Sequence, residues 1–300
     1  MSVPAAFLGV IVIWSTTPLA IQWSSEGWGY LFGATGRMVL GALLCVALIT
    51  VLRHKLPLDR KAWETYIAAG AGIYGAMMSV YWGSQYIPSG LVAVIFGLTP
   101  VATAVLAAFY LREASMTLGK LAGVGLGIIG LIVIFAADVN GHAVAWQGVA
   151  ALLVSVILHS SSAVWIKRIN RSLPALTTTT GGLLAAAPLY LVTWFIVDGE
   201  LPTNFDMRPG AAMIYLGVIG SVIGFSLYFY ILKNLEANRV ALIPLVTPVL
   251  ALIIGQSLNS EIISLDIWIG AAFILIALGM HQWGDQLFLN LKSLLVPIRR

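Results

Sequence analysis

Side chains that could bind an organic molecule recur at helical spacing on three apolar stretches. The three sets are Tyr74, Met78, Tyr81 and Gln85; Ser155, His159 and Ser162; and Gly217, Ser221, Gly224 and Tyr228. Spacings of three and four residues place each set on one face of a helix. Aromatic faces with a few polar groups suit partly apolar organic molecules, so the first two sets predict a binding cavity. Interhelical hydrogen bonding and close packing are the alternative for all three sets, and packing is favoured for the glycines of the third.

Two ionisable side chains lie well inside apolar stretches. His159 could hydrogen-bond a substrate and titrate near neutral pH, or it could hydrogen-bond a neighbouring helix. Arg37 is the charged residue farthest from any loop, and a charge inside a membrane is a candidate for function. Its guanidinium could attract a substrate carboxylate, cap helix carbonyls or reach outward toward Glu26.

Composition indicates that membrane helices hold these residues. The chain is 60% hydrophobic and 9% charged, with a mean hydropathy of +0.96, whereas soluble domains carry about 25% charged residues. A soluble protein this apolar could not cover its own surface. The sequence therefore predicts an integral membrane protein. Its single cysteine, Cys45, excludes an intrachain disulfide or a cysteine-based metal site, and we expect no metal.

The apolar stretches define an all-α bundle. A membrane helix needs about 20 mainly apolar residues. Ten such stretches occur, at about 3–22, 29–52, 63–86, 89–111, 117–137, 145–167, 176–198, 209–233, 238–259 and 265–284. If both termini are cytoplasmic, every lysine and arginine except Arg37 and Arg208 falls on the cytoplasmic side, in agreement with the positive-inside rule.

An internal repeat divides the chain. Residues 98–113 read LTPVATAVLAAFYLRE and residues 246–261 read VTPVLALIIGQSLNSE. Positions 99 and 247, 100 and 248, and 113 and 261 match at a constant offset of 148 residues, which is close to half the length. Five helices per copy is an odd number, so the second copy enters the membrane from the opposite side. Two inverted repeats, residues 1–138 and 139–287, followed by a cytoplasmic tail at 288–300, are typical of secondary transporters with a site between the halves.

The repeated prolines are predicted hinges. Pro100 and Pro248 each remove an internal hydrogen bond and can kink their helix. A pair of kinks related by the repeat could serve alternating access, or each proline could only bend its helix around a cavity.

The sequence resembles the drug/metabolite transporter superfamily, in particular its ten-helix exporters with two EamA domains. The resemblance rests on the run YWGSQYIPSGLVAVIFGLTP, the ending at Glu113, its counterpart FYILKNLEANRVALIPLVTP with Glu261, and on Trp14 and Arg37. It spans nearly the whole chain and implies export of amino acids, other metabolites or drugs. Helix seven has no arginine that matches Arg37, so the two halves are not equivalent.

The repeat also bears on Trp14 and Phe96. Both could line the cavity or only pack, and lining is favoured because helices one and four should lie at the repeat interface. Gly125, Gly127 and Gly130 resemble a dinucleotide fingerprint, but they fall within an apolar span without the strand that this motif requires. Helix packing is the better interpretation. With no Walker motif either, we expect no cofactor.

We therefore predict a transporter of the cytoplasmic membrane, not an enzyme, that exports small metabolites, with amino acids, including aromatic ones, as leading substrates. A multidrug or other metabolite exporter is the first alternative. A lipid-modifying enzyme is less favoured, because its candidates Asp138, Asn140 and His142 share one short loop, and a channel is disfavoured by the repeat and the aromatic interior. The expected partners are a small-molecule substrate and the lipid bilayer, with no nucleic acid, and a monomer could suffice.

Energy coupling is predicted from the acidic residues. All twelve fall in loops or near span ends, whereas proton-coupled transporters usually place a carboxylate inside the membrane. Facilitated diffusion or exchange is therefore the main hypothesis, and proton antiport through His159 is its rival.

Overall fold

The computed structural model describes residues 3–110, 117–139, 145–204, 206–224, 226–227, 230–231 and 243–295, and these form helices joined by short turns, with no strand among them. The elements are α1 (Val3–Ser25), α2 (Tyr30–Val51), α3 (Arg60–Gly83), α4 (Ser89–Phe96), α5 (Thr99–Tyr110), α6 (Leu118–Val139), α7 (Trp146–Ile169), α8 (Ala175–Val197), α9 (Met207–Tyr215), the π-helix η1 (Leu216–Ile223), α12 (Ile243–Asn259) and α13 (Leu265–Leu295).

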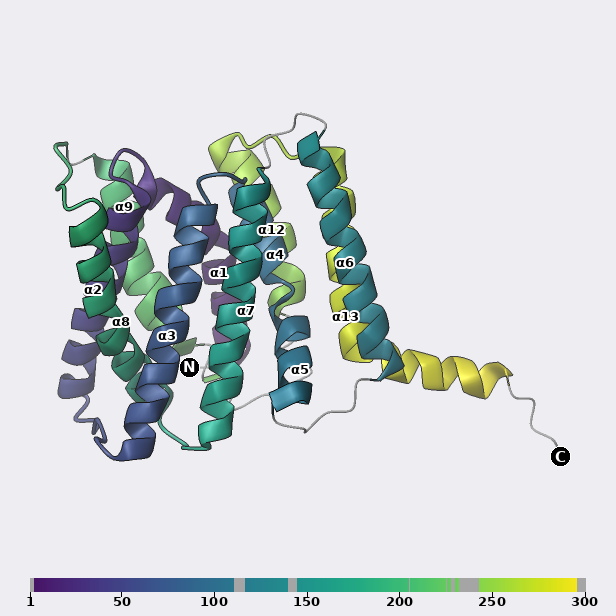
Figure 1. The fold of residues 1–300 in the computed structure, drawn as a ribbon, viewed down its shortest axis with the longest axis horizontal. Helices are drawn as coiled ribbons and strands as arrows, with labels where there is room; N and C mark the ends of the chain where they lie inside the picture. Colours follow the sequence, from purple (N-terminus) through teal and green to yellow (C-terminus); the bar gives the residue numbers. More distant parts are fainter. Residues whose placement is uncertain are drawn as a thin grey trace.

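These elements make ten passes through an antiparallel bundle, which confirms the predicted all-α fold. α4 and α5 together form one pass, as do α9 and η1, and successive connections alternate between the two ends (Figure 1). Counting only the described residues, six passes are long and apolar enough to span a membrane by themselves. A helix satisfies its backbone hydrogen bonds internally, which the lipid interior requires.

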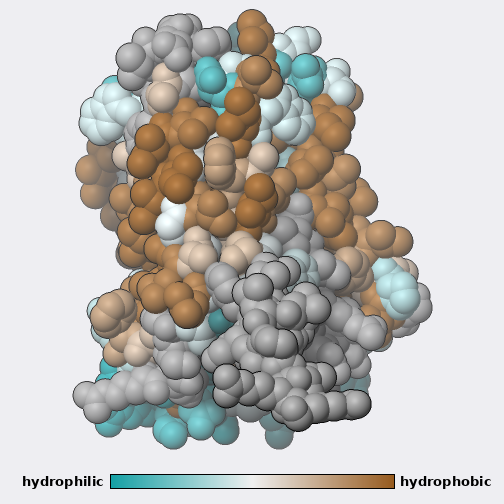
Figure 2. All heavy atoms as spheres, turned by 90° about the vertical axis from the view of Figure 1, so that its right-hand side faces the viewer, coloured by the Kyte–Doolittle hydropathy of each residue, from teal (hydrophilic) through white to brown (hydrophobic). Residues whose placement is uncertain are grey.

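We name the two ends of the bundle by the orientation that the charges predict. The outer end holds the turns at 26–29, 84–88 and 260–264, and the inner end holds those at 52–59 and 170–174. Figure 2, drawn from the side of α6 and α13, shows a hydrophobic band between more hydrophilic patches near both ends. This band is what the acyl chains of a bilayer would cover.

The helices pack as one main group and one outlying pair. α3 packs against α7 and α8, α2 against α8 and η1, and α4 against α12. α6 and α13 pack mainly against each other and stand at one edge of the bundle (Figure 1). A Cβ on Gly123 or Gly130 would lie 2.8 Å from a backbone oxygen of α13, at Ala277 or Gly270. The glycine-rich run therefore allows a close helix contact, as its packing interpretation predicts.

α13 is longer than the sequence indicated. The apolar pattern predicts a span that ends near residue 284, followed by a tail, but the helix continues to Leu295. Its last turns leave the bundle at the inner end and run away from the other helices (Figure 1).

Candidate transport site

One pass is broken where the repeated stretch of residues 98–113 begins. α4 ends at Phe96, and α5 begins at Thr99, one residue before Pro100. Proline is well accommodated in the first turn of a helix, where its missing N–H has no partner to lose. The Thr99 hydroxyl donates to the Phe96 carbonyl at 2.7 Å and satisfies one of the carbonyls that the break leaves free. The sequence predicted a kinked helix here, and the structure shows two helices.

The second copy of the Thr-Pro pair faces this break. Pro248 lies inside α12, which continues through it from Ile243 to Asn259. A Cβ built on Gly97 would lie 3.6 Å from Cγ of Pro248, so the break and the second proline are in contact. Further along the same crossing, a Cβ on Gly90 would lie 2.6 Å from Cα of Leu252, which requires glycine there. The α4–α5 break of the first repeat therefore contacts the second predicted hinge, Pro248, and the described part of α12 is continuous through that proline.

Aromatic and polar groups of α7 lie beside the break. The Phe96 and His159 rings lie 5.9 Å apart at 60°. Ser160 is fully buried, and its hydroxyl accepts from Thr103 at 3.0 Å and donates to the Thr99 carbonyl at 3.3 Å. The pair that the sequence predicted for the cavity, Phe96 and His159, thus adjoins the α4–α5 break.

The residues of the predicted stripe on α3 do not share one environment in the structure. The Tyr74 hydroxyl is 2.6 Å from that of Thr193 on α8, and its ring packs edge to face on Tyr190. Tyr81 is fully buried, and its hydroxyl has no hydrogen-bond partner among the described residues. α3 ends at Gly83, so Gln85 lies in the following turn, where it is exposed and donates to the Trp82 carbonyl. The helical spacing behind Gln85 therefore fails, because the helix stops short of it.

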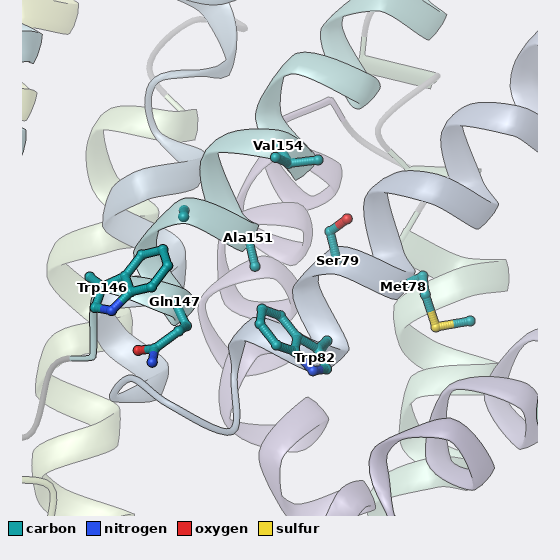
Figure 3. A pocket seen from close by; sticks show the side chains of 8 residues that line it. Met78, Ser79, Trp82, Trp146, Gln147, Ala151 and Val154 are labelled. Atoms are coloured by element: carbon teal, nitrogen blue, oxygen red, sulfur yellow. The ribbon is translucent and has the colours of Figure 1, made fainter. Parts of the chain in front are cut away.

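Met78 lines an open groove between α3 and α7. The groove has a volume of about 390 Å³ and opens on the bundle surface beside Trp82 and Trp146. Met78 lies at its edge, on the opposite side from Trp146 (Figure 3). Both tryptophans are partly exposed, so this groove belongs to the lipid-facing surface.

The serines of α7 are engaged with α3. Ser155 donates to the Ala76 carbonyl at 2.7 Å, and Ser162 donates to the Ala68 carbonyl at 2.8 Å. These are interhelical hydrogen bonds of the kind that the packing alternative predicted. Trp14 is partly buried and packs on a small cluster that includes Val10, Ile231 and Ile243. Tyr228 lies outside the described residues.

Arg37 is buried between α2 and η1. Its side chain is 3% exposed, and Nε donates to the Ser221 hydroxyl at 3.2 Å. The outward alternative does not describe this structure, because Glu26 instead pairs with Arg208 at 3.3 Å. The sequence marked Arg37 as unusual but could not indicate that its partner would come from the second repeat.

A hydrogen-bond network lies at the outer end of the bundle. Gln22 donates to the carbonyls of Ser84 and Ile87 at 3.0 and 2.8 Å. Asn259 donates to Gln22 and Glu261 at 3.4 and 3.1 Å. We call Gln22, Trp23, Arg208, Asn259 and Glu261 the outer network.

The same network joins both repeats around Asn259. Its side-chain oxygen accepts from Trp23 at 2.9 Å and from Arg208 at 3.1 Å. Glu261 accepts from the Gly90 amide at 3.4 Å, at the start of α4. This contact satisfies one of the free amides at the start of that helix. Sequence reasoning missed Gln22 and Asn259, and the only available signal was an amide side chain near the end of an apolar span.

The broken helix, the inverted halves and the buried polar groups define a multi-pass membrane transporter of the repeat type. The EamA-like transporter family model matches residues 2–136 and 146–281, one match in each half. The chain therefore belongs to the EamA-like transporter family, and its resemblance to the drug/metabolite transporter superfamily is confirmed.

Relatives from several bacteria cover most of the chain. It is 27% identical to "Protein PagO" of Salmonella typhimurium over 84% of this chain and 83% of that protein. It is 26% identical to "Uncharacterized inner membrane transporter YedA" of Escherichia coli K12, over 98% and 94%. For "Uncharacterized transporter YoaV" of Bacillus subtilis the identity is 23%, over 94% and 97%.

The fold has also been seen in a solved structure. A chain titled "Crystal structure of protein" superposes with a TM-score of 0.67 at 20% identity, and the match covers 96% of this chain and 98% of that one. At this identity the likeness concerns the fold alone.

Proposed function

We propose that the protein exports small metabolites, foremost amino acids with aromatic or other apolar side chains, by alternating access. The observation that carries the proposal is the contact between the α4–α5 break and Pro248 of α12. A discontinuous helix at the repeat interface is where secondary transporters bind substrate and bend. Phe96 and His159 beside it offer an aromatic surface and a hydrogen-bonding ring.

Alternating access requires a closure that can be released. The outer network joins the end of α1 to α12 and to the starts of α4 and α9 through neutral and charged hydrogen bonds. We infer that this structure represents a state closed at the outer end, and that release of the network opens it. Hydrogen bonds of about 1 kcal/mol each permit such a change without a large barrier.

The cellular setting is proposed from the relatives and the charges. YedA is named an inner membrane transporter, and we propose the same membrane for this chain, with both termini in the cytoplasm. Both repeats reside in one chain, so a monomer can form the complete pathway. Residues 1–138 and 139–287 are the proposed repeats, and the proposed tail begins at 288.

Transport by the purified protein tests the proposal. Proteoliposomes preloaded with unlabelled L-phenylalanine are expected to accumulate external labelled L-phenylalanine by exchange, and protein-free liposomes are not. A panel of aliphatic amino acids, nucleosides and lipophilic dyes defines the range. Exchange of none of these solutes would contradict the proposal.

Efflux of lipophilic compounds is the second candidate. It is favoured by the groove of Met78, Trp82 and Trp146, which opens toward the lipid and would admit apolar molecules from the bilayer. Transport of the dyes without transport of any amino acid would favour this candidate over the first.

The proposed energy source is the gradient of the substrate itself. The same proteoliposomes, without internal substrate and with a protonophore, are expected to take up labelled substrate until its concentrations are equal. Uptake that requires an imposed pH gradient, and that loses this requirement in His159→Gln, would support proton antiport instead.

A further inference from the structure

Arg37 carries a buried charge without an acidic partner in the part of the chain that the structure describes. The ion pairs recorded there lie near the ends of helices, between Arg60 and Glu64, Arg171 and Asp59, and Arg208 and Glu26. Arg37 donates through Nε to the neutral Ser221, and its NH1 is buried and has no hydrogen-bond partner among the described residues. An uncompensated charge inside a membrane protein is strongly unfavourable and marks a place where an anion is expected.

A small added group at Gly220 would lie in contact with the guanidinium. A Cβ built on Gly220 would lie 3.6 Å from NH2 of Arg37 and 3.9 Å from Oγ1 of Thr17, at ordinary contact distance. One turn earlier, a Cβ on Gly217 would lie only 2.7 Å from the Leu40 side chain. Small groups therefore fit beside Gly220 but not beside Gly217.

Two further features point to the same place. Gly220 and Ser221 belong to the π-helix η1, and π-helical turns occur frequently at functional sites. The Tyr81 hydroxyl is a second buried group without a partner among the described residues. Tyr81 and Tyr190 belong to one core cluster, and Thr35, two residues before Arg37, donates to the Tyr190 carbonyl, so both unpartnered groups lie on helices that pack around Tyr190.

We propose that Arg37 and Ser221 bind the carboxylate of the transported metabolite, in the space beside Gly220. The inference rests on the proposed function and names its substrate class, an organic monoanion or zwitterion. Arginine holds carboxylates through two parallel hydrogen bonds, and a serine hydroxyl that accepts one bond can donate another. A phosphate ester carries nearly two negative charges, which the single guanidinium would not balance.

A cysteine beside the guanidinium tests the site without knowledge of the substrate. Gly220→Cys, in a Cys45→Ala background, is treated in proteoliposomes with two methanethiosulfonate reagents, one carrying a sulfonate and one a trimethylammonium group. The ratio of the two labelling rates is the readout. With Arg37 present it is expected to favour the sulfonate at least about tenfold more than in Arg37→Gln, because the unit charge acts at short range in a poorly screened site.

Matched controls separate charge from structure. Arg37→Lys is expected to keep the preference for the sulfonate, and Gly224→Cys, one turn along, is expected to show a ratio that depends less on Arg37. With Arg37 intact, sodium benzoate is expected to slow labelling of Gly220→Cys severalfold, and benzamide at the same concentration is not. This last comparison remains decisive even if Arg37→Gln does not fold.

Equal protection by benzoate and benzamide, or a labelling ratio unaffected by Arg37→Gln, would overturn the inference. So would a failure of both reagents from both sides of the membrane, since a substrate site must be reached from one of them. Anion preference with no transport of any solute would sink the proposed function and leave the anion site standing. Transport of amino acids at unchanged rates by Arg37→Gln would overturn the anion site and leave the proposed function standing.

Discussion

At the scale of single residues, two buried tyrosine hydroxyls differ in their hydrogen bonding. Tyr190 is fully buried, and its hydroxyl donates to the carbonyls of Ile73 and Tyr74, both at 3.1 Å. Tyr81 is equally buried, but its hydroxyl has no hydrogen-bond partner among the described residues. A buried polar group that finds no partner reduces stability by about 1–3 kcal/mol. The unpartnered Tyr81 hydroxyl reduces the stability of the fold, and we propose that its hydrogen-bond partner is the substrate.

Tyr81→Phe and Tyr190→Phe should therefore differ in stability and in transport. Loss of the Tyr81 hydroxyl is expected to leave the melting temperature in detergent unchanged or higher and to reduce exchange in proteoliposomes severalfold. Loss of the Tyr190 hydroxyl is expected to lower the free energy of unfolding by about 1 kcal/mol, the net value of a typical hydrogen bond. Normal exchange by Tyr81→Phe would identify the hydroxyl as a packing defect without a role in transport.

At the scale of elements, the two Thr-Pro copies have diverged in structure. The first separates α4 from α5, and the second lies inside the continuous α12. Proline in a helix interior forfeits an internal hydrogen bond and can destabilise the helix by about 3 kcal/mol, whereas in the first turn it has little cost. The same substitution should therefore have unequal effects on stability at the two sites.

Pro248→Ala is expected to raise the melting temperature more than Pro100→Ala, and both are expected to slow exchange by stiffening the crossing. Thermal unfolding in detergent and exchange in proteoliposomes measure the two effects. Wild-type exchange in both variants would show that the prolines only shape the helices. A larger stability gain at position 100 would contradict the assignment of Pro100 to the first turn of α5.

The sequence predicted these elements better than it predicted their contacts. The repeat identified the place where α4 and α12 cross, because a Thr-Pro pair inside an apolar stretch is easily recognised in both halves of the sequence. The helical spacing did not reveal the end of α3. The predicted face therefore includes Gln85, although the helix stops at Gly83. The sequence did not indicate the network of Gln22 and Asn259, because an amide side chain near the end of a span is usually solvated. Their hydrogen bond joins residues 237 positions apart, which no local pattern reveals.

The outer network is predicted to control access to the interior of the bundle from its outer end. Asn259→Ala removes the hydrogen bonds to Gln22, Trp23, Arg208 and Glu261 and should favour the state open at the outer end. A cysteine at Ser84, buried beneath Gln22, reports access in a Cys45→Ala background. An impermeant maleimide in whole cells is expected to label it about tenfold faster in Asn259→Ala, since about 1.4 kcal/mol shifts an equilibrium tenfold.

The matched control for this experiment is Arg171→Ala. It removes an exposed ion pair to Asp59 at the opposite end of the bundle and is expected to leave labelling at position 84 unchanged. Equal acceleration by both substitutions would indicate general loosening. No acceleration by Asn259→Ala would mean that the outer network does not control access.

At the scale of the whole molecule, the charges predict the orientation of the bundle in the membrane. Lys61 and Arg168 lie exposed at the inner end, and Glu200 lies exposed at the outer end. Cysteines at these three sites, in a Cys45→Ala background, are expected to divide in whole cells. Only position 200 should react with an impermeant reagent, and positions 61 and 168 should react after the membrane is permeabilised. Labelling of the reverse set would invert the topology.

The pairing of α6 with α13 bears on how the protein is made. α6 closes the first half of the chain, and its glycines lie against α13, where Gly130 meets Gly270. Domains of many proteins fold in the order of their synthesis, beginning at the N-terminus. Here α6 enters the membrane long before its partner has been translated. We therefore expect the first five helices to stand in the bilayer without the main partner of α6 until the last helix has been inserted.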